Sequence, residues 1–256
     1  MGHVVNALHV WGAARDEGGR VLLRIEDHDR QRCRPEYEAA ILEDLVWLGF
    51  AHEGPVTRQS DRDAGYRNAL ATLAGQGLVY GCTCTRADID SAPPHLRTPA
   101  PPHQERRYPG TCRDRGIPLS DGVGWRLRLD SGIERFNDVM CGPQEQDPSA
   151  QGGDLLLRDR LGNWTYQFAV TVDDDLQDIT DIIRGIDLLP STGRQIRLAR
   201  LLGRTRPPRF RHHPLVMKSP TDKLSKSDGD MGVRDLRAAG WTSGQVRDHA
   251  TALARL

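Results

Sequence analysis

The sequence lacks any apolar run that approaches the roughly 20 residues required to cross a membrane, and no basic segment precedes a continuous apolar one near its start. We therefore expect neither a membrane-spanning helix nor a secretory signal. Cysteine is scarce and odd in number, with five residues, two of them in the triplet Cys82-Thr83-Cys84. This usage argues against a secreted disulfide framework and favours reduced thiols or a metal site in a cytoplasmic protein.

Lysine is nearly absent. Only three of the 35 basic residues are lysines, and all three lie in one short stretch, at Lys218, Lys223 and Lys226. Because arginine does not replace the compact, mobile charge of lysine well, this cluster favours a loop that faces phosphate over a chance group on a solvated loop. Two lysines beside serines also suit a polyphosphate whose charge builds up during a reaction. The arginines could contact nucleic-acid phosphates even at a formal net charge of zero, if they cluster on one face.

Hydrophobic periodicity predicts alternating helices and strands, which is typical of an α/β layered sheet. We expect helices over residues 4–15, 35–48, 61–77 and 191–203, and strands over 21–25, 125–130, 154–159 and 162–167. Ser191 is a candidate N-cap, and Gly203 lies just beyond the last helix. The segment 166–183 mixes helical and strand signals. Residues 91–110 contain six prolines, so we expect an irregular insertion there.

Gly2 and His3 stand at the start of the first predicted helix. A helix N-terminus presents free backbone N–H groups and positive dipole character, which suit a phosphate. His3 could also donate a hydrogen bond to a phosphoryl oxygen. A surface histidine explains the pattern equally well, so this motif alone does not decide between the two.

Two further groups of residues could bind a small polar molecule. Glu26, Asp27 and Asp29 follow the first predicted strand, where carboxylates could bind an ammonium group or a ribose. An ordinary charged turn is an equally common explanation. Arg184 follows an apolar stretch and, with Tyr166, could hold a carboxylate through paired hydrogen bonds. A core tyrosine and an ordinary salt bridge are the alternatives.

Three cysteines form a candidate metal site: Cys82, Cys84 and Cys112. Three thiolates and one further ligand make a closed tetrahedral zinc site. The fourth ligand could be His95, His103 or Tyr108. Unligated structural thiols are the alternative, but a Cys-x-Cys pair followed by a proline-rich insertion and another cysteine favours zinc.

Together these segments resemble the catalytic domain of the class I glutamyl-tRNA synthetases, and most closely that of their short paralogues, the glutamyl-queuosine tRNA(Asp) synthetases. The resemblance runs in order from residue 2 to about 230 and rests on four motifs. KLSKS (223–227) is similar to the KMSKS loop, RIED (24–27) to the family's RIED segment, RGIDLLPSTGRQ (184–195) to its RG-x-DLL-x-ST-x-RQ segment, and CTC (82–84) with YPGTC (108–112) to the zinc site of the short paralogues. Each motif alone is weak, but the combination is highly specific.

The resemblance implies an α/β fold, with a class I aminoacyl-tRNA synthetase Rossmann-like parallel sheet, a zinc-containing insertion and a short α-helical C-terminal piece with the KMSKS-type loop. It divides the chain into four regions. Residues 1–80 would form the first half of the nucleotide-binding Rossmann-like domain, 81–135 the zinc-containing insertion, 136–205 the second half of that domain, and 206–256 the KLSKS loop and a short C-terminal helical region.

The resemblance also implies a ligase that activates glutamate with ATP to glutamyl-adenylate and transfers it to queuosine in the anticodon of tRNA(Asp). Glu26 would bind the ammonium group of glutamate, and Tyr166 and Arg184 its carboxylate end. Magnesium would accompany ATP, and we expect a monomer in the cytoplasm.

The remaining site residues are assigned by the same resemblance. Gly2, His3 and Lys226 would bind ATP. His3, Lys223 and Lys226 would be catalytic, because they would stabilise the triphosphate. A structural zinc ion would be held by Cys82, Cys84, Tyr108 and Cys112.

The sequence departs from the family at its start. The family signature His-x-Gly-His opens the first helix, but only Gly2 and His3 correspond to it here, and the family's preceding strand and ATP-contacting turn have no counterpart. That strand is central in a doubly wound sheet, so without it we expect its neighbours to lack a partner, at a cost of several kcal/mol in orphaned backbone groups. A gene start assigned too late explains this better than a damaged copy, because the downstream motifs are intact.

Two other functions compete with this one. A fragment of a glutamyl-tRNA synthetase would charge a tRNA 3′ end, although only about 30 residues follow the KLSKS loop, too few for a separate anticodon-binding region. A non-catalytic relic would bind only tRNA or zinc, and the intact Glu26, Arg184 and Lys226 argue against it.

Overall fold

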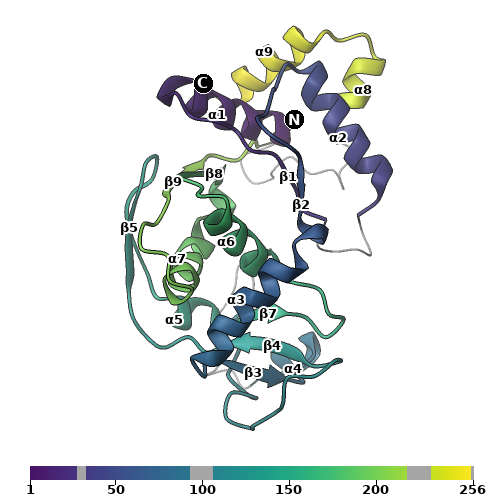
Figure 1. Cartoon of the computed structure of the whole chain (residues 1–256). Helices are drawn as coiled ribbons and strands as arrows, with labels where there is room; N and C mark the ends of the chain where they lie inside the picture. The colour runs from purple at the N-terminus through teal and green to yellow at the C-terminus, as the bar shows by residue number, and fades with distance from the viewer. Residues whose placement is uncertain (28–32, 93–105, 218–231, 255–256) are drawn as a thin grey trace.

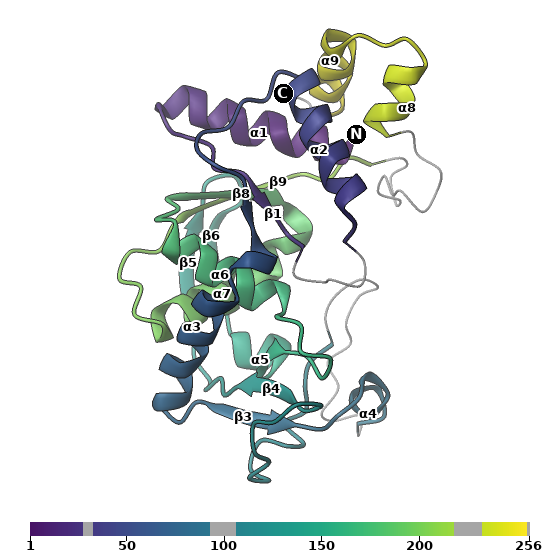
Figure 2. The same ribbon diagram turned by 45° about the vertical axis from the view of Figure 1, so that its right-hand side comes forward.

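The computed structural model describes residues 1–27, 33–92, 106–217 and 232–254. They form an elongated molecule in which four helices lie together at one end and a small sheet lies at the other (Figures 1 and 2). Within these residues, no helix is both long and apolar enough to span a membrane.

The helical end consists of α1 (Gly2–Glu17), α2 (Pro35–Trp47), α8 (Val233–Ala238) and α9 (Ser243–Ala254). Apolar side chains of these helices and the segments beside them form one core, with buried Val4, Val5, Leu48, Phe50, Val216, Leu236, Val246 and Ala250. Because α1 packs directly against α9, segments from the two ends of the chain share this core.

A four-stranded mixed sheet lies beside α1, with the strand order β6-β5-β9-β8. Its strands are β5 (Glu134–Asp138), β6 (Gly142–Gln146), β8 (Asp181–Gly185) and β9 (Arg209–His213). β5 and β8 both run parallel to β9, whereas β5 and β6 form an antiparallel hairpin. Helix α7 (Thr192–Leu201) connects β8 to β9 as in a βαβ unit. The predicted parallel sheet is therefore confirmed for three strands.

The opposite end contains a three-stranded antiparallel sheet with the order β3-β4-β7. Its strands are β3 (Val79–Cys82), β4 (Gly124–Leu127) and β7 (Leu155–Arg158), and the short helices α4 (Arg86–Asp90) and α5 (Pro148–Gly152) lie nearby. Helices α3 (Asp63–Gly75) and α6 (Tyr166–Leu176) pack against each other. Together with the sheet they form the larger core, whose buried members include Tyr66, Leu73, Leu127, Leu157, Phe168 and Leu198.

The third sheet contains only β1 (Arg24–Ile25) and β2 (Thr57–Arg58), which pair in parallel. Among the described residues β1 has no second strand partner, and β8 pairs only with β9. The strand predicted over 21–25 is only two residues long and half-buried.

The four predicted helices are confirmed with small shifts at their ends, and β4 and β7 confirm two predicted strands. The strand predicted over 162–167 is wrong, because Trp164 forms only an isolated bridge with Arg158 and Tyr166 already begins α6. The Trp164 ring is buried in the larger core, and its Nε1 donates to Asp63 Oδ1 at 2.8 Å. Tertiary packing therefore overrides the strand preference of this aromatic stretch.

Two details of the helix predictions have different outcomes. Helix α6 followed by β8 accounts for the mixed signals of residues 166–183. Ser191 precedes α7 but does not cap it, since its Oγ accepts a hydrogen bond from Gln167 Nε2 at 2.9 Å. Gly203 follows α7 with φ of 98°, a left-handed conformation that favours glycine, as predicted.

Candidate active site

A hollow of about 1030 Å³ lies between α1, β1 and β8. Residues 20–24 form one of its walls and residues 180–185 another, so the edges of β1 and β8 that lack a strand partner border it. Five of the predicted site residues line it: Gly2, His3, Glu26, Tyr166 and Arg184. The structure thus brings the start of α1 and the three predicted glutamate-binding residues to one place.

Helix α1 lines the hollow along its length, and Gly2 and His3 stand at its positive end. No side chain of the described residues caps the helix, and its first turn contains no acidic residue. Gly2 and His3 are both exposed there. Backbone N–H groups and a helix dipole in this arrangement suit a phosphate group.

Arg184 is the most deeply buried of the five, with 8% of its surface exposed. Its Nε donates to His212 Nε2 and its Nη2 donates to Thr192 Oγ1, each at 3.0 Å. Both partners are neutral. The Asp174 and Asp138 carboxylates attract the guanidinium, but within the described part of the chain they pair with Arg24 and His212 and form no ion pair with Arg184. Burial lowers the pKa of Arg184 from its usual range, although an arginine remains charged. The hollow is therefore lined by a buried cation that forms no direct ion pair with a described carboxylate.

Tyr166, the first residue of α6, lies beside Arg184 and shares a side-chain hydrogen bond with it. Burial raises the pKa of Tyr166 above its usual value, and the nearby Glu26 carboxylate raises it further. The hydroxyl therefore stays protonated and can donate a hydrogen bond. Glu26 itself is exposed at the carboxyl end of β1. A donor, a cation and a carboxylate are thus arranged around the same space.

Three residues near Arg184 were missed from the sequence: Asp138, Thr192 and His212. His212 lies opposite Arg184 in the β8–β9 register, and its Nδ1 lies 2.6 Å from Asp138 Oδ2. His212 and Asp138 are both fully buried in the sheet. Burial lowers the pKa of His212, so its imidazole is neutral, although the Asp138 carboxylate opposes this effect. Only Thr192 belongs to a recognised motif, and nothing local in the sequence links the other two to Arg184.

The acidic segment after β1 does not act as one group. Asp27 accepts hydrogen bonds from the Ser60 backbone N–H at 2.8 Å and from Ser60 Oγ at 2.6 Å, which favours a structural role. Arg24 Nη1 donates to Asp174 Oδ1 at 2.7 Å and ties β1 to α6. Glu26 is therefore the carboxylate of this segment that lines the hollow within the described part of the chain.

Several predicted residues lie outside the described residues. They are Asp29, the alternative zinc ligands His95 and His103, and the three lysines Lys218, Lys223 and Lys226. The KLSKS loop and its relation to the hollow therefore stay predictions.

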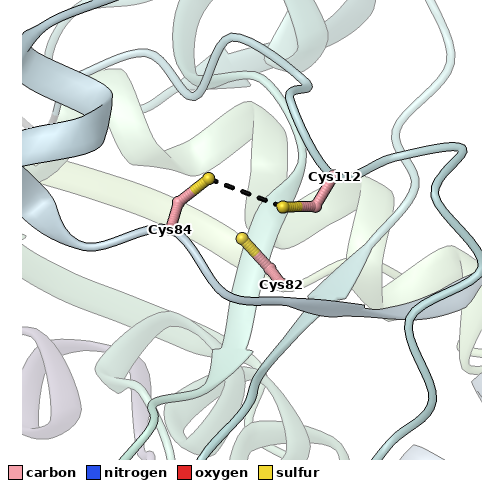
Figure 3. A group of neighbouring side chains, drawn as sticks. All are labelled: Cys82, Cys84 and Cys112. Atoms are coloured by element: carbon pink, nitrogen blue, oxygen red, sulfur yellow. Dashed lines mark hydrogen bonds between the residues drawn. The ribbon is translucent and has the colours of Figure 1, made fainter.

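A second cluster lies far from the hollow, at the β3–β4 end of the molecule. Figure 3 shows the sulfur atoms of Cys82, Cys84 and Cys112 pointing toward one another, and all three lie within 4.8 Å of each other. The Sγ atoms of Cys84 and Cys112 are 3.5 Å apart, and the Tyr108 hydroxyl lies 3.4 Å from Cys82 Sγ. The structure therefore groups the four predicted zinc ligands.

The spacing of these atoms fits a tetrahedral metal site. Zn–S bonds of about 2.3 Å separate two sulfurs by about 3.8 Å, and a Zn–O bond of about 2.0–2.2 Å separates the oxygen from a sulfur by about 3.5 Å. Although burial alone would raise it, hydrogen bonds with Thr83, Cys84 and Tyr108 lower the pKa of Cys112 to about 6. Burial and the hydrogen bond with Cys112 raise the pKa of Cys84 to about 12. A divalent cation bound here would also remove the proton of the Cys84 thiol.

Comparison with known proteins points to one family. Residues 1–247 match the family described as tRNA synthetases class I (E and Q), catalytic domain. A glutamyl-Q tRNA(Asp) synthetase of Bordetella bronchiseptica is 47% identical over 231 residues, which cover 89% of this chain and 71% of that protein. A glutamyl-Q tRNA(Asp) synthetase of Rhodobacter capsulatus is 38% identical over 96% of this chain and 93% of that protein.

Solved structures indicate the same family at lower sequence identity. The crystal structure of a glutamate tRNA ligase from Elizabethkingia meningosepticum in complex with its amino acid superimposes with a TM-score of 0.73 and 27% identity. The match covers 90% of this chain and 49% of the ligase, so this chain spans about half the length of that protein. The glutamate-tRNA synthetase of Elizabethkingia anophelis has a TM-score of 0.74 over 90% of this chain and 50% of its own.

Proposed function

The chain belongs to the catalytic-domain family of the class I tRNA synthetases for glutamate and glutamine, and on that premise we propose that it activates glutamate with ATP and transfers it to queuosine in the anticodon of tRNA(Asp). One observation carries the choice of substrate. Arg184 is a buried cation that forms no direct ion pair with a described carboxylate, and it lines the hollow beside a phenol and a carboxylate. Because buried charges require a partner, an anionic substrate group fits this position.

Glutamate has three charged groups, and the residues around the hollow complement them. Glu26 binds the ammonium group, and Tyr166 and Arg184 bind one carboxylate. That carboxylate is the one on the side chain, because a carboxylate held by paired hydrogen bonds to a guanidinium is a poor nucleophile. The α-carboxylate is then left to react. A buried arginine also disfavours glutamine, whose neutral amide would leave the buried charge unpaired.

The reaction itself requires positioning and charge stabilisation rather than acid–base chemistry. The α-carboxylate of glutamate attacks the α-phosphorus of ATP in line, and pyrophosphate leaves. The start of α1 with Gly2 and His3 binds phosphate, and Lys223 and Lys226 stabilise the charge on the triphosphate. Magnesium accompanies ATP. A hydroxyl of queuosine then attacks the carbonyl carbon of glutamyl-adenylate, and AMP leaves.

We assign the cysteine cluster to a structural zinc ion held by Cys82, Cys84, Tyr108 and Cys112. The close approach of the sulfur and hydroxyl oxygen atoms supports this ligand set. The cluster lies at the β3–β4 end of the molecule, away from the hollow beside α1 and β8, so zinc stabilises the β3–β4 region and takes no part in the reaction.

The queuosine acceptor is supported by the names of relatives that are more similar in sequence to this chain than the glutamate tRNA ligases of the solved structures. The proteins that are 38–47% identical to this chain are named glutamyl-Q tRNA(Asp) synthetases, whereas the glutamate tRNA ligases are 27% identical. Charging of a tRNA 3′ end is the competing function.

The activation step is tested by glutamate-dependent exchange of pyrophosphate into ATP, measured with the natural full-length protein. We expect Arg184→Ala to lower kcat/KM for glutamate by about 10²-fold or more, because it removes a charged partner of the substrate. Lys226→Ala is expected to lower kcat by about 10²-fold, as for loss of a donor to the transition state. Arg135→Ala is the control, because Arg135 is an exposed arginine on β5, away from the hollow.

An exchange rate that does not depend on glutamate would remove the proposed substrate. Equal kinetics for Arg184→Ala and Arg135→Ala would instead leave the reaction class in place and remove the assigned binding residue.

A further inference from the structure

Two buried residues behind Arg184, Asp138 and His212, do not line the hollow but are connected to it. They lie on the central strands β5 and β9 of the mixed sheet. Their connection runs through Arg184, whose Nε donates to His212 Nε2 at 3.0 Å. A buried acidic residue, a histidine and an arginine thus form a chain that ends at the candidate glutamate site.

The hydrogen bonds determine the tautomer of His212. An arginine has no acceptor atom, so its N–H must donate and His212 Nε2 must carry a lone pair. The ring proton is then on Nδ1, which lies 2.6 Å from Asp138 Oδ2. The other tautomer would direct an N–H of the ring at an N–H of Arg184.

Asp138 is itself held in place by the backbone. Its Oδ1 accepts hydrogen bonds from the N–H groups of Met140 and Cys141, at 3.0 and 2.9 Å, in the turn between β5 and β6. Its Oδ2 is therefore directed at the His212 ring. With Thr192 Oγ1 as a second acceptor for Arg184, rotation of the guanidinium would leave buried polar groups unsatisfied.

We infer that Asp138 and His212 form a positioning pair that orients Arg184 toward the side-chain carboxylate of glutamate, an inference that rests on the glutamate-binding role proposed for Arg184. A histidine suits this position better than a carboxylate would. A carboxylate next to Arg184 would neutralise it and compete with the substrate, whereas a neutral imidazole fixes its direction and leaves its charge for glutamate. Asp138 supplies the negative charge one side chain further away, where it selects the tautomer.

Three substitutions separate the two hydrogen bonds of the ring. His212→Asn keeps an N–H donor near the position of Nδ1 but removes the acceptor for Arg184. His212→Gln keeps an acceptor near the position of Nε2. Asp138→Asn preserves shape, but its amide can donate to Nδ1 and so stabilises the wrong tautomer.

The test is glutamate-dependent ATP–pyrophosphate exchange with the natural full-length protein and these variants. We expect His212→Asn and Asp138→Asn to raise the KM for glutamate at least about tenfold, the usual effect of losing a hydrogen bond to a charged group, with the KM for ATP changed less than about twofold. His212→Gln should recover most of the loss. Thermal unfolding of each variant identifies those that fold like the unchanged protein.

An equal rise in both KM values, or an unchanged glutamate KM in the folded asparagine variants, would overturn the positioning role. Arg184→Ala distinguishes this failure from a failure of the proposed function. If it leaves the glutamate KM unchanged, Arg184 does not bind glutamate. If it raises that KM while the His212 and Asp138 variants do not, only the positioning pair is wrong.

Discussion

At the scale of single residues, the protein holds the charge of Arg184 in a buried place without a direct ion pair to a described carboxylate. Arg184 donates to an imidazole and to a threonine hydroxyl, which direct the guanidinium without forming an ion pair. Arginine and lysine are not interchangeable here, because a lysine could not donate to both partners in the same planar geometry. The binding role of Arg184 is predicted from its motif. Its orientation, however, depends on the side chains of His212 and Asp138, 28 and 46 positions away in the sequence.

The buried His212 predicts a pH dependence of stability. Its pKa in the folded protein is lowered from its usual value by burial, so the unfolded chain binds the proton first as the pH falls. The free energy of unfolding should therefore decrease as the pH falls below about 6.5, by up to about 1.4 kcal/mol per pH unit for one proton, until the folded-state pKa is passed. The charged and titratable side chains that act on the His212 ring are those of Asp138, Arg184 and His213. Asp138, whose pKa is also lowered, loses its contribution to stability at still lower pH, where its carboxylate becomes protonated.

Urea unfolding between pH 7 and 5 measures this effect. His212→Asn should show a shallower decrease than the unchanged protein, because the titrating group is gone while the other histidines remain. Parallel curves for the two proteins would show that His212 is not the neutral, proton-excluding group described above.

At the scale of helices and strands, the sequence predicts individual elements better than it predicts which elements pack or pair with each other. The amphipathic helices and the strands β4 and β7 are recognisable from periodicity. The failed strand at 162–167 shows the limit, because the environment of Trp164 is decided by the core against which it packs. The register of β8 on β9 places His212 opposite Arg184, and a register between distant strands has no local signal.

The glycine after α5 provides a test of the packing around Tyr108. Gly153 has φ of 67° and ψ of −162°, a conformation essentially limited to glycine, and a Cβ there would lie 2.2 Å from the Tyr108 carbonyl oxygen. We expect Gly153→Ala to lower the free energy of unfolding by about 2 kcal/mol or more. Gly122→Ala is the matched control, since Gly122 also has a positive φ (77°) but nothing within 4 Å of its Cβ position, and it should cost only about 1 kcal/mol. Equal losses in urea unfolding would contradict the close contact with Tyr108.

The cysteine cluster predicts one zinc ion per chain, which connects β3 to the segment around Cys112. Metal analysis of the purified protein should give one equivalent of zinc, and Cys112→Ser should lose it together with several degrees of thermal stability. Cys33→Ser is the control, because Cys33 is exposed and stands apart from the cluster. Protein that contains no zinc, with all five thiols open to titration, would remove this site.

At the scale of the whole molecule, the hollow lies beside α1 toward the helical end, whereas the cysteine cluster lies at the β3–β4 end. The order of motifs along the chain is sufficient to indicate the family, because each motif combines residues that are close in sequence. The hollow itself could not be predicted, since it is formed by α1, β1, α6 and β8, which only the fold brings together.

The central claim is that the activated glutamate goes to queuosine. The most direct measurement incubates the natural full-length protein with radiolabelled glutamate, ATP and tRNA(Asp) that contains or lacks queuosine, and then digests the tRNA to nucleosides. We predict label only in the queuosine-containing tRNA, on the anticodon nucleoside. Label on the 3′-terminal adenosine of either tRNA, or no transfer while glutamate-dependent exchange proceeds, would contradict this claim.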